Sequence, residues 1–407
     1  MVPKGWSKKE LGDIAYITSG GTPSREKVEY WANGTIPWIR TTEVQNCVLN
    51  LDDTKEFITE LGLKKSSAKL VPAGSILLAM IGQGKTRGQV ALLNFEASTN
   101  QNCAVIILNA DNDPVFYFNY LLSQYESIRG ASNSAGQSNL SSALVKAIRV
   151  SVPPYFEQQK IAQILSTWDQ AISITEKLLD NSQQQKKALM QQLLTGKKRL
   201  LDAHGVRFNT AWEKKKLREL GEVVGGLTYT PEDVTDSTGN LVLRSSNIQN
   251  GRLVFNDNVY VKCELTDKTR TKENDILICV RNGSRSLIGK SALLKDQGVD
   301  CFHGAFMTIF RTLEPLFIFQ IMQSDLFFRE VNKNLGATIN SINGSDLRNF
   351  SFLIPTSKEE RDSIASVLST ADLEIDRLYK YIDFLKREKK ALMQQLLTGK
   401  KRVKVAA

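Results

Sequence analysis

A glycine-rich stretch in the first half of the sequence has the residue types of a phosphate-binding loop. The segment from Ala79 through Gly84-Lys85-Thr86 follows an apolar run and fits a relaxed Walker A spacing, in which backbone N–H groups would cradle phosphates. Ala79 stands where the stricter form has glycine, and residues 280–285 of the second half keep nothing like this loop. No acidic residue at the end of a following apolar strand offers itself for magnesium. An ATPase therefore remains only an alternative that these residues do not favour.

A second stretch, Val152-Pro153-Pro154-Tyr155, has the form of the loop that holds the target amino group in adenine methyltransferases. Val152 stands where that chemistry needs an amide or a carboxylate. Neither half begins with a glycine-rich cofactor fingerprint, and no pair of acidic residues is distinctive enough for a nuclease site. We predict no catalytic residues, and we interpret the two prolines as the break between a domain and a helix.

The sequence has few residues that could bind a metal or form disulfides. The only histidines are His204 and His303, too few for histidine metal centres, so we predict no metal site. The five cysteines form no CxxC pair, and their odd number argues against a disulfide framework. We expect reduced thiols in a cytosol. The N-terminus has no apolar signal region and no apolar run is long enough to span a bilayer.

Composition is that of an ordinary globular protein: 407 residues, 42% hydrophobic and 24% charged. With 53 basic against 43 acidic residues the net charge is +10. A polyanionic partner would suit this charge, and a solvated basic surface explains it about as well.

An internal repeat organises the chain. The string KKALMQQLLTGKKR occurs at residues 186–199 and again, 203 residues later, at residues 389–402. Landmarks further upstream recur in the same order, such as Arg40-Thr41-Thr42 and Arg244-Ser245-Ser246. Each half is therefore predicted to be one mixed domain followed by one helix.

The helix of each half has a heptad pattern, with apolar positions stepping alternately by four and three. Glu157 to Thr195 contains no Pro or Gly and could form a helix of roughly 58 Å at 1.5 Å per residue. Gly196 and Gly399 stand where C-terminal caps would be. Ordinary long core helices would also explain the pattern, but two matching seams in one chain favour a coiled coil between the two copies. The predicted coiled-coil and partner-binding positions are Ile161, Leu165, Trp168, Leu189, Leu193, Ile364, Leu368, Ile382, Leu392 and Leu396.

The domains that precede these helices contain strand patterns at residues 75–81, 89–93 and 104–108, bounded by Gly and Asn turns. Asp113-Pro114 is predicted to open a helix, with Asp as N-cap and Pro at the first position, and Glu314-Pro315 to do the same in the second half. The aromatic residues of these helices are interpreted as core rather than as a base-stacking platform.

Polar and basic residues occur at equivalent places in the loops of both halves, next to glycine-containing turns that allow close backbone approach. Arg, Lys, Asn and Gln are side chains suited to base edges and phosphates. Each residue alone is explained as well by a solvated surface, but two such sets on two related domains favour DNA. The residues predicted to contact DNA are Arg40, Thr41, Thr42, Lys85, Arg87, Gln101, Gln137, Asn139, Arg244, Ser245, Asn247, Arg281, Arg285, His303 and Asn340.

This organisation resembles the specificity subunit of type I restriction-modification enzymes, over essentially the whole chain. The resemblance is carried by the twin KKALMQQLLTGKKR segments, by the helix starts at 157–162 and 360–365, and by Gly74-Ser75-Ile76-Leu77 with Asn274-Asp275-Ile276-Leu277, which depart from the family motif at their first positions. It implies an α+β fold with two mixed α/β target-recognition domains, at 1–153 and 204–355. Two long antiparallel helices, at 154–203 and 356–407, would form a coiled coil and give a pseudo-twofold repeat.

The resemblance also implies a function. Such a subunit is a non-catalytic reader of a bipartite, asymmetric target in double-stranded DNA, within a type I site-specific deoxyribonuclease and adenine DNA methyltransferase complex. It recruits two modification subunits, which use S-adenosylmethionine, and two restriction subunits, which use ATP and Mg. The expected location is the cytoplasm of a prokaryote, with no membrane partner. The competing class is an assembly scaffold whose basic loops bind nothing specific.

Overall fold

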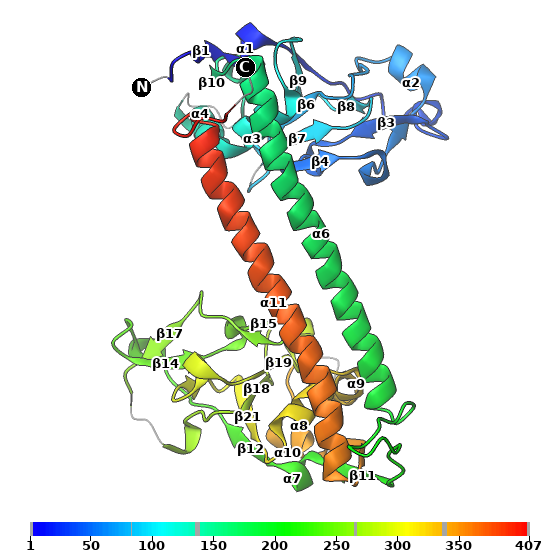
Figure 1. Cartoon of the computed structure of the whole chain (residues 1–407), viewed down its shortest axis with the longest axis vertical. Helices are drawn as coiled ribbons and strands as arrows, with labels where there is room; N and C mark the ends of the chain where they lie inside the picture. The colour runs from blue at the N-terminus through cyan, green and yellow to red at the C-terminus, as the bar shows by residue number, and fades with distance from the viewer. Residues whose placement is uncertain (1–2, 83, 135–138, 264–266, 336–339, 405–407) are drawn as a thin grey trace. The chain divides into compact units, whose positions relative to one another are not determined.

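The computed structural model describes residues 3–82, 84–134, 139–263, 267–335 and 340–404 (Figure 1). The chain divides into two compact units. Unit 1 comprises residues 1–176 and 381–407, and unit 2 comprises residues 177–380. Each unit thus contains the mixed domain of one half and a part of both long helices.

The two long helices are α6 (Tyr155–Leu193) and α11 (Lys358–Leu396), of 39 residues each. Both end as the repeat predicts. Gly196 and Gly399 have φ of 69° and 71°, in the left-handed region that glycine adopts without strain. The N–H of Lys198 donates to the carbonyl of Gln192 at 3.1 Å, and that of Lys401 donates to Gln395 at 3.1 Å, so both caps satisfy carbonyls of the last turn.

In unit 1, the first part of α6 runs antiparallel to the last part of α11. Asp169 pairs with Lys389 at 2.5 Å, and Glu176, further along α6, pairs with Lys386, further back along α11. The seam positions Ile161 and Leu165 on α6 and Leu396 on α11 are buried in one core with the mixed domain. Ile382 is also buried, whereas Trp168 and Leu392 are half-buried. The predicted pairing of the two helix copies is confirmed here.

Unit 2 repeats this arrangement with the roles of the helices exchanged. Lys186 on α6 pairs with Asp372 on α11 at 2.6 Å, the same pair displaced by 203 residues in both partners. Leu193, Ile364 and Leu368 are buried with the second domain, and Leu189 is packed partly buried against them. The sequence repeat therefore corresponds to a repeat of contacts.

The mixed domain of unit 1 is built on a five-stranded sheet in the order β2-β9-β6-β7-β4, antiparallel except for β4 with β7. Strands β6 and β7 are apolar throughout because both of their faces are buried. One face packs with α3 and the long helices, and the other packs with a smaller sheet, β5-β3-β8. The bounds are β2 Ala15–Ser19, β3 Ile36–Ile39, β4 Cys47–Leu49, β5 Phe57–Ile58, β6 Ile76–Ala79, β7 Val90–Leu93, β8 Ser98–Thr99, β9 Cys103–Leu108 and α3 Pro114–Ser123.

The domain of unit 2 follows the same plan with a four-stranded sheet, β12-β21-β18-β19, packed on α8. A second sheet, β13-β17-β14-β20, takes the place of the smaller sheet. The bounds are β12 Glu222–Gly225, β13 Val234–Thr235, β14 Asn240–Leu243, β15 Ile248–Gln249, β16 Arg252–Leu253, β17 Val259–Val261, β18 Ile276–Cys279, β19 Ser291–Leu293, β20 Phe302–His303, β21 Met307–Arg311 and α8 Pro315–Met322.

Each half is closed by a two-stranded sheet that joins its beginning to the segment before its long helix. Strand β1 (Ser7–Glu10) pairs with β10 (Arg149–Val152), and β11 (Trp212–Lys216) pairs with β22 (Ser351–Pro355). The shorter helices are α1 Leu11–Ile14, α2 Glu60–Lys64, α4 Tyr125–Ser134, α5 Ser142–Lys146, α7 Leu217–Leu220, α9 Asp325–Asn334 and α10 Gly344–Asn349. The 3-10 turns are η1 Val28–Tyr30, η2 Thr41–Glu43, η3 Leu51–Asp53, η4 Pro231–Asp233, η5 Ser245–Asn247, η6 Asp267–Thr269, η7 Arg285–Leu287 and η8 Asp296–Gly298.

The starts of α3 and α8 differ in one predicted detail. The Asp113 carboxylate accepts from the N–H of Phe116 at 2.8 Å, so Asp113 is the expected N-cap. Glu314 is also the N-cap residue, with Pro315 first in the helix as predicted, but its side chain makes no capping hydrogen bond. Its carboxylate instead accepts two hydrogen bonds from the Arg361 guanidinium, both at 2.7 Å, at the start of α11.

Candidate nucleic-acid interface

Four loops of the unit 1 domain meet at one surface, and hydrogen bonds join them. The hydroxyl of Thr41, just after β3, donates to the Asn100 side chain at 2.9 Å. The N–H of Met80, after β6, donates to the carbonyl of Asn102 at 2.9 Å, and the N–H of Leu140 donates to that of Met80 at 2.9 Å. The loops after β3, after β6, before β9 and before α5 therefore lie side by side.

The domain of unit 2 repeats this bonding pattern. The N–H of Val280, after β18, donates to the carbonyl of Phe306 at 3.0 Å, and the N–H of Ile342 donates to that of Val280 at 2.8 Å. The N–H of Gly304 donates to Leu243, the last residue of β14. The two halves thus have equivalent loop surfaces, in which Phe306 takes the place of Asn102.

Arg40 and Arg244 occupy the same position, at the end of β3 and of β14. Each has a carboxylate partner: Arg40 pairs with Glu56 at 3.0 Å and Arg244 with Asp257 at 2.9 Å. Both side chains remain partly exposed. The ion pairs orient the guanidinium groups and leave their exposed faces available to a phosphate.

The three predicted polar residues beside these arginines differ in their exposure to solvent. Thr41 is buried, and Asn247 is fully buried in the turn that follows Arg244. The Asn247 side chain accepts from the Arg244 N–H at 2.9 Å and donates to the Val254 carbonyl at 2.9 Å, so its hydrogen bonds serve the fold. Thr42 is exposed.

The basic loop after β6 and β18 presents three of its four predicted cations. Lys85, Arg281 and Arg285 are exposed. Arg87 is buried. Gly88 and Gly289 make the same hydrogen bond to the preceding strand, so Arg87 occupies the position of the buried Ile288 in the second domain. We therefore remove Arg87 from the interface.

The predicted amide residues lie on the same loops. Gln101 and Asn139 are exposed, and the Gln101 side chain accepts a hydrogen bond from the Thr22 hydroxyl. The Asn340 side chain donates to the carbonyl of Gly283 at 3.1 Å, and Ser245 accepts from the Asn282 side chain at 2.9 Å. Gln137 lies outside the described residues.

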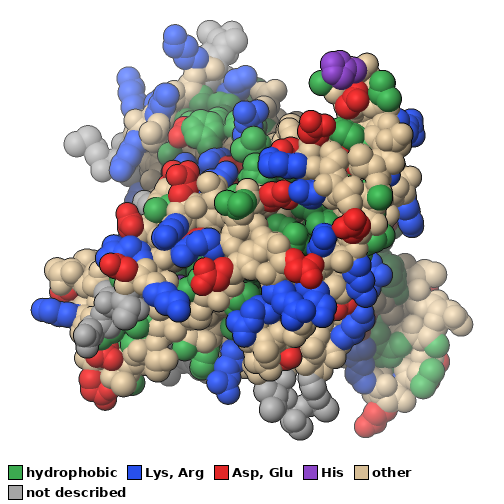
Figure 2. Space-filling view, turned by 90° about the horizontal axis from the view of Figure 1, so that it is seen from below, with side chains coloured by type: hydrophobic (Ala, Val, Ile, Leu, Met, Phe, Trp, Pro, Cys, Tyr) green, Lys and Arg blue, Asp and Glu red, His purple; other side chains and the backbone are tan. Residues whose placement is uncertain are grey.

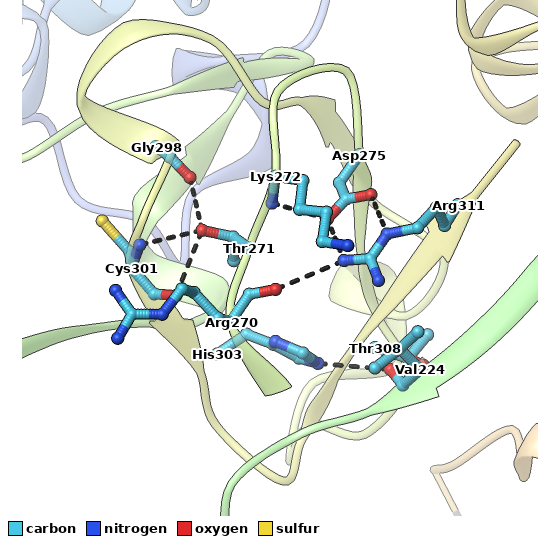
Figure 3. A network of polar contacts seen from close by, with 10 residues as sticks. All are labelled: Val224, Arg270, Thr271, Lys272, Asp275, Gly298, Cys301, His303, Thr308 and Arg311. Atoms are coloured by element: carbon cyan, nitrogen blue, oxygen red, sulfur yellow. Dashed lines mark hydrogen bonds and ion pairs between the residues drawn. The ribbon is translucent and has the colours of Figure 1, made fainter. Parts of the chain in front are cut away.

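His303 is fully buried and does not reach this surface (Figure 3). Its Nε2 lies 3.2 Å from the carbonyl oxygen of Val224, and the Thr308 hydroxyl donates to the same oxygen. Burial lowers the pKa of His303, so the ring is neutral at pH 7. Thr99, its counterpart in the first domain, is also buried. With no exposed atom to touch DNA, His303 is removed from the interface.

The polar network near His303 shows the structural role of Asp275, which belongs to the Asn274-Asp275-Ile276-Leu277 segment noted in the sequence (Figure 3). Asp275 is buried and accepts from the Arg311 guanidinium at 2.8 and 2.7 Å, which braces the start of β18 against the end of β21. The Asp275 carboxylate also raises the pKa of Arg311. At the equivalent position, the Ser75 hydroxyl donates to the carbonyl of Pro72 at 2.7 Å. Asp275 and Ser75 thus fix the start of the strand that precedes the basic loop in each domain.

The loop after β6 does not have the setting of a nucleotide site. A phosphate-binding loop leads from a strand into a helix. Here β6 and β7 are antiparallel neighbours, and the described residues between them, 80–82 and 84–89, contain no helix. Among the described residues, no three His, Cys, Asp or Glu side chains are grouped so that they could hold a metal ion. No described helix combines the length and apolar character needed to cross a membrane.

On the face shown in Figure 2, charge alone does not mark an interface. Lys and Arg side chains are spread over the face shown in Figure 2, with Asp and Glu among them. The candidate surface is therefore defined by the bonded loops. One of its residues was not predicted from the sequence: Phe306, an exposed ring in the turn before β21.

Comparison with known families agrees with this architecture. The type I restriction modification DNA specificity domain matches residues 3–181 and again residues 209–383, one match for each half. These matches cover more than half of the chain, which therefore belongs to this family of specificity proteins.

Several curated relatives are specificity subunits of type I restriction enzymes. The EcoR124I/EcoR124II specificity subunit of Escherichia coli is 34% identical over 42% of this chain and 43% of its own length. The MjaIX specificity subunit of Methanocaldococcus jannaschii is 30% identical over 43% of this chain and 40% of its own length. The chain thus matches less than half of the length of these two relatives. The MjaVIII specificity subunit of M. jannaschii is 22% identical over 99% of this chain and 94% of its length.

Among solved structures, the S subunit of a type I restriction-modification system from M. genitalium has the same fold. It superposes with a TM-score of 0.60 over 98% of this chain and 99% of its own, at 16% identity.

Proposed function

We propose that this chain is the DNA-reading specificity subunit of a type I restriction-modification complex. The observation that carries the proposal is the paired loop surface. The same four loops meet in both domains, they keep an arginine at the same strand end, and they differ at other exposed positions. Two related but unlike surfaces suit a bipartite target with two unlike halves.

Within each surface, residues divide by chemistry. Arg40, Lys85, Arg244, Arg281 and Arg285 carry the charge for phosphate contacts. Thr42, Gln101, Asn139, Ser245 and Asn340 have the hydroxyl and amide groups that read base edges in a groove. We propose these ten residues as the DNA interface, and we assign Thr41 and Asn247 to holding the turns beneath it.

We further propose that the recognition domains are residues 1–153 and 204–355, and that the helical segments 154–203 and 356–407 set the separation of the two half-sites. DNA-binding dimers commonly read half-sites about one helical turn apart, near 34 Å. A helix of 39 residues, roughly 58 Å long, is long enough for that task. The base pairs between the half-sites would go unread.

The long helices also offer apolar surface for partner subunits. Leu178 and Tyr381 are separated by the repeat distance of 203 residues, and both are exposed. Exposed apolar residues at matching positions suit two copies of one partner. We propose two modification subunits, which bind S-adenosylmethionine and methylate adenine, and two restriction subunits, which use ATP and Mg. The chemistry belongs to those partners, in the cytoplasm of a prokaryote.

The test is an exchange of residues 1–150 for the same domain of another such subunit. The complex with the modification subunit is assayed by sequencing methylated DNA. We expect one half-site to change while the other half-site and the spacing stay. A change in both half-sites, or in the spacing alone, would contradict the modular proposal.

A binding assay across salt concentrations separates this proposal from a scaffold. The complex should bind its target more tightly than a scrambled duplex at every salt concentration. A scaffold would show no sequence-dependent difference. ATP turnover by the isolated chain would instead favour the enzyme alternative.

A further inference from the structure

Phe306 stands at a position where the two reading surfaces differ in kind. The carbonyl of Phe306 accepts from the N–H of Val280, and the carbonyl of Asn102 accepts from the N–H of Met80, the equivalent residue of the first domain. The first surface therefore has an amide side chain where the second has an aromatic ring.

Phe306 is 56% exposed. Four other phenylalanines of the same domain, Phe302, Phe310, Phe317 and Phe327, are at most 1% exposed. The core is thus built from buried rings, and the exposed ring contributes little to it. The ring lies on the loop surface proposed to bind DNA, where a ligand can reach it.

The backbone around Phe306 is held firmly. Its carbonyl accepts from two successive N–H groups, those of Val280 at 3.0 Å and Arg281 at 3.1 Å. The N–H of Met307 closes the turn on the carbonyl of Gly304 at 2.8 Å, and Met307 begins β21 as a buried residue. The ring is therefore attached to a preorganised turn, as a residue that reads a ligand requires.

Arg281 lies beside Phe306 on the same loop surface. The Arg281 guanidinium carbon lies 5.5 Å from the ring centroid, a cation–π distance, and among the described residues no carboxylate pairs with Arg281. Asn282 donates to Ser245 and Asn340 donates to the carbonyl of Gly283, so hydrogen bonds hold the neighbouring loops in place beside the ring.

We propose that Phe306 is a specificity-determining residue whose ring contacts the 5-methyl group of a thymine in the half-site read by the second domain. This inference rests on the proposed function. The thymine methyl is the apolar group that the base pairs present in the major groove, and phenylalanine is suited to it. Arg281 supplies the positive charge that holds the DNA backbone beside the ring.

Deoxyuridine tests this contact because it lacks only the methyl group. The full chain, assembled with its modification subunit, is titrated with duplexes in which each thymine of that half-site is replaced in turn. We expect the wild-type complex to lose about fourfold in affinity at one position, the value for one buried methyl group. Phe306→Asn, which introduces the residue of the first domain, should abolish the difference between the two bases there. Phe306→Leu should keep part of it.

Leu313→Asn is the matched control, because Leu313 is 99% exposed in the same domain and lies outside the four loops. It should leave the uracil response unchanged. Indifference of the wild-type complex to every replacement, or an unchanged response in Phe306→Asn, overturns the inference. If the wild-type complex does not distinguish its target from a scrambled duplex, the proposed function itself fails, which is a separate outcome.

Discussion

The ammonium of Lys389 lies 2.5 Å from the carboxylate of Asp169, and only 11% of the lysine side chain is exposed. Lysine occupies a seam position of α11 there, where heptad patterns usually place an apolar residue. The pair recurs in unit 2 as Lys186 with Asp372. Each pair joins α6 to α11 and is satisfied in the antiparallel alignment. Polar groups of this kind fix the register of helices at some cost in stability.

Asp169→Ala is expected to destabilise unit 1, because it leaves the ammonium of Lys389 nearly buried without its partner. Asp169 is half exposed, so the loss should be about 1–2 kcal/mol, below that of a fully buried pair. Chemical denaturation measures it. The double exchange Asp169→Lys with Lys389→Asp should recover much of the loss, and Asp383→Asn, at an exposed position of α11, should change little. Equal stability of Asp169→Ala and the wild type would show that the pair contributes nothing.

Acid should weaken the unit 2 domain through His303. Burial lowers the pKa of this ring in the folded state. The hydrogen bond to the Val224 carbonyl and, to a smaller extent, the Asp275 carboxylate oppose this effect, and the Arg311 guanidinium adds to it. The unfolded chain, with a pKa near 6.5, therefore binds the proton more readily. Stability from this group is complete above pH 6.5 and is lost as the pH falls below it, by up to about 1.4 kcal/mol per pH unit.

His303→Asn removes this titration. Denaturation between pH 5.5 and 7.5 should show a flatter pH dependence in the variant than in the wild type. His204 is exposed, and His204→Asn provides the matched control, with the wild-type slope. A variant slope equal to that of the wild type would assign the pH dependence to other groups.

The helical part of the fold could be predicted from the sequence because its signals are local and repeated. An exact repeat, a heptad seam and a glycine after each copy specify helix, partner and end. The strands around Leu77, Ala91 and Val105 could be predicted because short apolar runs between turn residues have few alternatives.

The site was harder to predict because burial depends on tertiary contacts. Arg87 and His303 are polar residues that each precede a glycine in the sequence, yet both side chains are buried. Glu314 precedes a proline as a cap would, but a distant partner, Arg361, takes its carboxylate. Phe306 lies in a turn directly after Gly304-Ala305, a signal that could have indicated an exposed ring.

The two capping glycines should respond differently to the same substitution. Alanine at either site is strained, because both have positive φ, and should cost about 1 kcal/mol. A Cβ on Gly196 would meet the Trp212 ring at 3.4 Å, an ordinary contact, whereas one on Gly399 would lie 2.4 Å from Cγ of Pro3. Thermal unfolding should therefore show a larger loss for Gly399→Ala than for Gly196→Ala. The reverse order would mean that the Pro3 contact yields without cost.

Removing single cations from the loop surface should weaken DNA binding without unfolding the chain. Lys85 and Arg281 are both exposed, and their side chains bury little that the fold needs. If each contacts one phosphate, alanine at that position lowers the slope of log affinity against log salt by about 0.9. Lys333→Ala is the control, because Lys333 is an exposed cation on α9 of unit 2 that already pairs with Glu330. The measurement is a salt titration of the complex with its target duplex, with melting temperature as the check on folding. Unchanged affinity and slope in both variants would exclude Lys85 and Arg281 from the interface, and an equal effect in Lys333→Ala would mean that charge alone, rather than these loops, attracts the DNA.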